Sequence, residues 1–85
     1  MKREEFLKER LLSFKEFEDG WCGTNSKKFK EAHIKKAIKE IKPMLRRFKS
    51  VGFAKRKVHV VPTASGQIQF EAESDTTYLE IMVEK

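Results

Sequence analysis

Lysines and arginines at helical spacing are the residues in this sequence whose types and positions most clearly suggest a chemical role. Five of them would lie within about 60° of arc on one side of a helix: Lys28, Lys35, Lys39, Lys42 and Arg46. A second cluster, Lys55-Arg56-Lys57, follows shortly after. Such groups attract nucleic-acid phosphates or the acidic surface of a protein. An ordinary solvated helix face is the alternative, but such a face usually mixes signs, and only Glu31 and Glu40 interrupt these cations.

The positive charge is concentrated in the middle of the chain. The whole sequence has a net charge of +6, whereas residues 21–57 hold thirteen Lys or Arg and two Glu, a net charge of +11. Residues 1–20 have a net charge of −1 and residues 58–85 a net charge of −4. This asymmetry predicts that the basic middle segment forms the interaction surface.

Other reactive residues do not form a recognisable catalytic or metal-binding set. Cys22 is the only cysteine, which excludes an internal disulfide and a cysteine-based zinc site. The two histidines, His33 and His59, fall on different predicted elements, so a small hydrolase built around Cys22 is the least favoured hypothesis. Glu71 and Glu80 should lie close together on a sheet, but on an open face that would not desolvate them. We therefore assign no catalytic residue, metal or cofactor and expect a protein that is not an enzyme.

Length and composition indicate what class of protein carries these residues. The chain has 85 residues, of which 39% are hydrophobic and 38% charged, as expected for one domain spanning residues 1–85. No purely apolar run exceeds three residues, so we expect no membrane span. No apolar segment follows the first cations, so we expect no secretory signal peptide and a reduced, cytoplasmic protein.

Two helices are predicted in the first fifty residues. The first spans residues 2–17, with an apolar stripe formed by Phe6, Leu7, Leu11, Phe14 and Phe17. A loop follows, in which we expect Trp21 to pack as a lid over one end of the core. The second helix should begin near Ser26, with Thr24, Asn25 or Ser26 as its N-cap, and end near Ser50. Its apolar stripe stays in phase across Pro43, which predicts one kinked helix instead of two.

Beyond residue 57 the apolar period becomes two, which predicts three strands joined by turns at 62–66 and 74–75. Short loops would pair Val60 with Ile68 and Phe70 with Leu79, which places one apolar set on one face: Val58, Val60, Ile68, Phe70, Leu79 and Ile81. The predicted fold is α+β, with two helices packed on one face of a three-stranded antiparallel β-meander.

The other sheet face should be open, as an ordinary solvated face or a modest interaction surface. Its expected members are His59, Val61, Gln67, Gln69, Glu71, Tyr78, Glu80 and Met82. The last strand has a free edge that could pair with a second copy of the chain, although Glu80 and Glu84 along it disfavour such a dimer.

Short motifs give a resemblance to a group of small uncharacterised bacterial proteins with a helix–loop–helix–β-meander order. The segment Phe17-Glu18-Asp19-Gly20-Trp21-Cys22-Gly23 is similar to their W-D-G-x-G loop. Residues 66–71 and 78–81 are similar to their G-x-I-x-x-E-W and L-x-I-E strands. Cys22 and Ala72 depart from the pattern, since Asp or Asn and Trp are usual there. The resemblance implies a bacterial or mobile-element origin and an accessory role, and carries no established activity.

The sequence therefore predicts a small cytoplasmic accessory module that binds an acidic protein partner. Its size would suit a regulatory protein of the antitoxin or inhibitor type. The contact would use the basic helix or the open sheet face. The alternative is nonspecific nucleic-acid binding through the same lysines and arginines.

Overall fold

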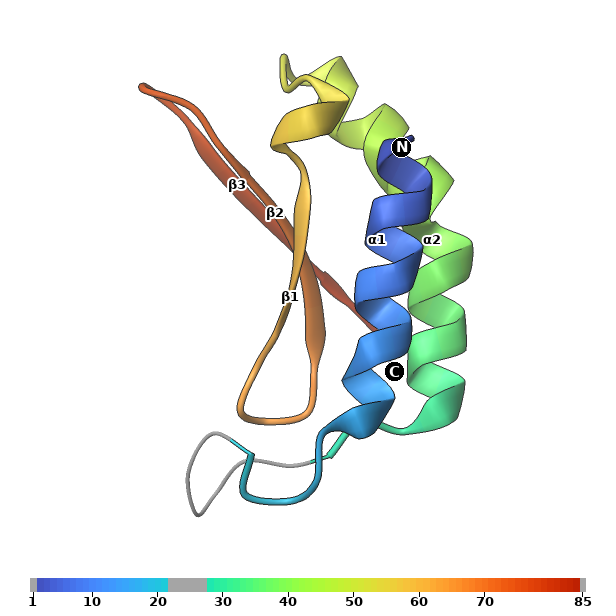
Figure 1. The fold of residues 1–85 in the computed structure, drawn as a ribbon. Helices are drawn as coiled ribbons and strands as arrows, with labels where there is room; N and C mark the ends of the chain where they lie inside the picture. Colours follow the sequence, from blue (N-terminus) through green and yellow to red (C-terminus); the bar gives the residue numbers. More distant parts are fainter. Residues whose placement is uncertain (1, 22–27, 85) are drawn as a thin grey trace.

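The structure is a computed structural model that describes residues 2–21 and 28–84. The elements follow in the order α1 (Arg3–Ser13), η1 (Phe14–Glu16), α2 (Glu31–Ser50), η2 (Lys55–Lys57), β1 (His59–Pro62), β2 (Ile68–Glu73) and β3 (Tyr78–Val83). The three strands form one antiparallel sheet in the order β1-β2-β3. Figure 1 shows α1 and α2 side by side on one face of that sheet. The α+β prediction is thus confirmed.

The first helix is shorter than its sequence pattern suggested. The α-helix ends at Ser13 and a single 3₁₀ turn, η1, follows, so the prediction of a helix through residue 17 is wrong at its end. Leu7, Leu11 and Phe14 are fully buried. Phe6 is 39% exposed because it lies about 100° around the helix from Leu7, outside the arc that contacts α2 and β1.

The second helix begins later than predicted. It starts at Glu31, because Lys30 has an extended backbone (φ −75°, ψ 137°). The candidate N-caps Thr24, Asn25 and Ser26 lie outside the described residues. The helix is continuous through Pro43 to Ser50, so the single-helix prediction is confirmed.

An aromatic cluster accounts for the late start of α2. The Phe29 ring lies 5.2 Å from the Phe14 ring, 5.9 Å from Phe17 and 5.8 Å from Trp21, measured between centroids. Trp21 in turn stacks on Phe17 at 4.7 Å. Phe29, the residue before Lys30, is therefore held in the core by its ring at a position that lies outside the helix. Trp21 packs against the core, as predicted.

The strand registers differ from the predicted ones by two residues. Val60 pairs with Phe70, and Phe70 pairs with Ile81, because both connections are longer than expected. The first is a five-residue loop, in which Gly66 takes a positive φ of 81° and Thr63 donates its N–H to the Gln67 carbonyl at 2.9 Å. A shift of two residues preserves the faces. The expected apolar face therefore still points inward, with Val83 added to its buried members.

The core lies between the helix pair and this face of the sheet. Among the described residues it contains seventeen buried apolar side chains, drawn from both helices, all three strands and the segments between them. Leu79 and Ile81 of β3 are only partly buried. No helix in the described part of the chain is long and apolar enough to cross a membrane.

Candidate functional site

A row of four cations lies along the exposed face of α2. Lys35, Lys39, Lys42 and Arg46 follow one another at intervals of three or four residues and are all exposed. The buried residues of the helix occupy the opposite side, because they contact α1 and the sheet. The predicted basic row is therefore present for these four residues. Lys35 is held 3.5 Å from Glu31 (Nζ to Oε1), and this is the one ion pair among the described residues.

The row meets a basic hollow at the end of the molecule where α1 begins. The hollow has a volume of about 790 Å³. Five cations and a single acid, Glu4, line it together with Phe6: Lys2, Arg3, Lys42, Lys55 and Arg56. Figure 1 shows why these distant residues meet, since the start of α1, the later part of α2 and η2 lie at one end. Lys42 belongs to both the row and the hollow.

We call these eight residues the cationic surface: Lys2, Arg3, Lys35, Lys39, Lys42, Arg46, Lys55 and Arg56. Arg3 is its most constrained member. Its guanidinium donates from Nε and Nη2 to the Val58 carbonyl at 2.9 and 2.6 Å, and Nη2 also lies 3.0 Å from Nδ1 of His59. The same guanidinium lies over the Phe6 ring at 4.4 Å, and burial lowers the pKa of Arg3. Arg3 therefore fixes the wall of the hollow, whereas the three lysines that line it, Lys2, Lys42 and Lys55, form no ion pair with a described residue.

The end of α2 positions η2. Gly52 has a φ of 98°, and its N–H donates to the Lys49 carbonyl at 3.0 Å. Phe53 donates its N–H to the Phe48 carbonyl, also at 3.0 Å, and the two rings pack at 6.0 Å. This arrangement is a Schellman motif, which ends a helix and reverses the chain. It places Lys55 and Arg56 beside Lys42.

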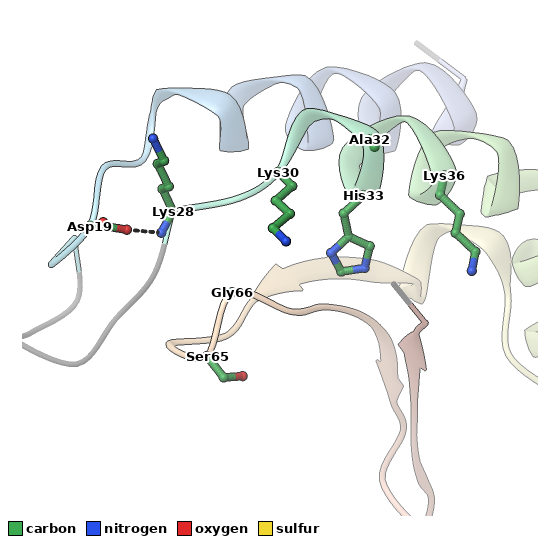
Figure 2. Close-up of a pocket in the computed structure, with 8 residues that line it drawn as sticks. All are labelled: Asp19, Lys28, Lys30, Ala32, His33, Lys36, Ser65 and Gly66. Atoms are coloured by element: carbon green, nitrogen blue, oxygen red, sulfur yellow. Dashed lines mark hydrogen bonds between the residues drawn. The ribbon is translucent and has the colours of Figure 1, made fainter.

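Two of the predicted binding residues lie outside the hollow and the row. Lys28 precedes α2, so its placement on the helical row was wrong. Its backbone N–H donates to Oδ1 of Asp19 at 2.9 Å, and its ammonium group points away from the start of α2 (Figure 2). Lys57 belongs to η2 and is exposed, but does not line the hollow. Lys2, Arg3 and Phe6 were missed, because the sequence does not show that the first turn of α1 reaches η2.

A second hollow, of about 660 Å³, lies at the opposite end of α2. The start of α2 forms one wall of this hollow, with the side chains of Lys30, His33 and Lys36. The β1–β2 loop forms the opposite wall, with Ser65 and Gly66. His33 is 5% exposed, and its Nε2 lies 3.1 Å from the Val83 carbonyl. Sequence reasoning placed His33 on the helix without assigning it to a site.

The open sheet face carries a polar network centred on Tyr78. The Tyr78 hydroxyl lies 2.8 Å from Oε2 of Glu80 and 2.9 Å from Oε2 of Glu71, and Gln69 donates to Glu80 at 3.1 Å. The hydrogen bonds to Glu80 and then Glu71 raise the pKa of Tyr78. The predicted proximity of Glu71 and Glu80 is confirmed, and they are direct cross-strand partners. This face is exposed and acidic, in contrast to the cationic surface.

In residues 2–21 and 28–84, no three His, Cys, Asp or Glu side chains are grouped so that they could hold a metal ion. Cys22, the centre of the hydrolase hypothesis, lies outside the described residues. Comparison of the chain with protein-family models, with curated proteins and with solved structures finds no match.

Proposed function

We propose that this protein is a non-enzymatic binding module that docks an acidic protein through the cationic surface. The observation that carries the proposal is the basic hollow, in which five cations from three separate segments meet with one carboxylate. None of Lys42, Lys55 and Arg56 forms an ion pair with a described residue. Their charges are therefore available to attract a partner of opposite charge.

The composition of the hollow favours a protein partner. Phe6 is 39% exposed at its rim and is flanked by the Arg3 guanidinium. Arginine and aromatic side chains are enriched in the energetically dominant centres of protein interfaces. An apolar ring surrounded by cations would match an acidic surface with an apolar contact at its middle.

The sheet face is the weaker of the two surfaces expected from the sequence. Glu71 and Glu80 lie opposite one another on this face. Glu73, at the end of β2, and Glu84, directly after β3, add further negative charge. An acidic partner would be repelled there. We therefore assign the contact to the cationic surface. The resemblance to small bacterial proteins supports a bacterial accessory role, and the size of the chain suits a cytoplasmic regulator of the antitoxin or inhibitor type.

Affinity capture from a lysate of cells that produce the protein tests this proposal. We expect the native protein to retain a specific acidic protein, and the triple variant Lys39→Glu/Lys42→Glu/Lys55→Glu to lose it. The matched control, Lys15→Glu/Lys30→Glu/Lys36→Glu, has the same net charge and should retain it, because these exposed lysines lie outside the cationic surface. Equal recovery by both variants would remove the cationic surface as the docking site.

Nucleic acid is the second candidate, and the exposed row of α2 favours it. Its four cations extend over about 16 Å at a rise of 1.5 Å per residue, a length over which duplex DNA presents several phosphates. This alternative predicts that nuclease treatment abolishes capture and that the purified protein retards DNA and RNA at about 50 mM salt. Capture that survives nuclease, without retardation at that salt, favours the acidic protein.

A further inference from the structure

The hollow at the start of α2 is built differently from the basic hollow. Figure 2 shows the side chains of Lys30, His33 and Lys36 extending from α2 toward the strands, with the imidazole between the two lysines. The β1–β2 loop forms the opposite wall, where Gly66 brings the backbone close without a side chain. The volume of about 660 Å³ is that of a small-molecule site.

His33 holds an unused hydrogen-bonding atom at this hollow. Because a carbonyl oxygen only accepts, Nε2 must donate its proton to the Val83 carbonyl at 3.1 Å. Nδ1 is buried and has no hydrogen-bond partner among the described residues. A buried polar atom without a partner is costly and uncommon in folded proteins, which points to a ligand that the atom is set to meet.

The start of α2 adds to the attraction for an anion. Lys30 is the N-cap residue and its side chain makes no capping hydrogen bond. The first amide groups of a helix point outward and carry partial positive charge, which favours an anion. The ammonium groups of Lys30 and Lys36 flank the same space.

We propose that this hollow is a binding site for a phosphate-type oxyanion, held between Lys30 and Lys36 and hydrogen-bonded by protonated His33. Protonation of the ring converts Nδ1 from an acceptor into a donor, which an oxyanion oxygen can meet. The remaining charged groups that line the hollow are Lys28, in the segment before α2, and Asp19. From β3 the ring meets the Val83 carbonyl, and the β1–β2 loop contributes only the uncharged Ser65 and Gly66.

Binding of the anion and protonation of His33 must then favour each other. Sulfate is a suitable probe, because its charge does not change near neutral pH. Its affinity, measured by calorimetry at constant ionic strength, should rise as the pH is lowered, because anion binding and ring protonation favour each other. A His33→Gln variant should lose this pH dependence, while His59→Gln should keep it, because the exposed His59 contacts Arg3 far from this hollow.

Charge-matched variants separate this site from general attraction to a basic protein. Lys30→Ala/Lys36→Ala should weaken sulfate binding about tenfold, whereas Lys39→Ala/Lys42→Ala, which removes the same charge from the cationic surface, should change it by less than about twofold. All four lysines are exposed, so both variants are expected to fold. Inorganic phosphate and phenyl phosphate, compared at one pH, distinguish a site for the free ion from a site for an organic phosphate, because only the second kind of site would bind phenyl phosphate more tightly.

The NMR signals of the two histidine rings provide an independent measurement. Addition of sulfate should move the His33 signals and leave those of His59 in place, whereas chloride at equal ionic strength should move neither. The proposal is overturned if the two lysine pairs prove equally important, or if sulfate leaves the His33 ring signals unchanged.

Discussion

On the open sheet face, hydrogen bonds to Tyr78 and Gln69 allow the carboxylates of Glu71 and Glu80 to lie close together. Glu71 and Glu80 are directly opposite on neighbouring strands, an arrangement of like charges that is unfavourable by itself. The hydroxyl of Tyr78 lies within hydrogen-bond distance of both, and Gln69 donates to Glu80 from the other side. The single hydroxyl proton and the Gln69 amide offset part of the repulsion between the two carboxylates.

We expect Tyr78 to ionise above the ordinary tyrosine value of 10.0, because its hydrogen bonds to Glu80 and Glu71 favour the neutral hydroxyl. It is the only tyrosine in the chain, so the phenolate absorbance in a pH titration reports it alone. Glu80→Gln should lower the pKa toward the ordinary value, and Glu84→Gln should not. The unfolded chain loses this proton first, so the contact stabilises the fold below about pH 10 and loses that effect at higher pH. A titration midpoint that both variants leave unchanged would contradict the assignment.

His33 illustrates what a sequence can reveal at this scale. It stands four residues before Ala37 and eight before Ile41, both buried, so it continues the apolar stripe of α2 by one more turn. A histidine at such a position is a signal that sequence inspection can detect. The donor role of Nε2 toward Val83 was out of reach, because those residues are fifty positions apart.

At the scale of elements, aromatic contacts determine where α2 begins. Phe14, Phe17, Trp21 and Phe29 form the cluster that joins the end of α1 to the segment before α2. Local propensity favoured a start near Ser26, but tertiary packing of the 7% exposed Phe29 overrides it.

The strand registers also differ from the predicted ones, because local sequence leaves the lengths of the connecting loops open. Alternation specifies which face each residue occupies, whereas loop length, which alternation does not encode, specifies its partner.

Phe29→Ala should lower the free energy of unfolding by about 3 kcal/mol, the usual cost of deleting a buried aromatic ring. Phe6→Ala is the matched control, since Phe6 is 39% exposed; it should cost less than about 1 kcal/mol. Urea unfolding followed by circular dichroism measures both. Equal losses for the two variants would show that the cluster does not anchor the start of α2.

In the folded molecule, the basic and the acidic residues are separated in space more completely than they are along the chain. Residues 21–57 already carry most of the positive charge, and that much was readable from the sequence. The structure adds Lys2 and Arg3 from the first turn of α1 and excludes Lys28, so the basic hollow is a product of three segments meeting. Arg3 and Arg10 also donate to the Val58 and Val60 carbonyls, which covers the outer edge of β1 with α1. The acidic sheet face is left on the other side of the core.

Zero-length carbodiimide cross-linking tests the central claim most directly, because the reagent joins a lysine amine only to a carboxylate that it already contacts. Applied to the lysate, it should join Lys39, Lys42 or Lys55 to aspartate or glutamate residues of a second protein, as identified by mass spectrometry. Lys15, Lys30 and Lys49 serve as exposed internal references and should give few such links. Links distributed equally over both sets of lysines, or absent from the cationic surface, would contradict the proposal that this surface docks an acidic protein.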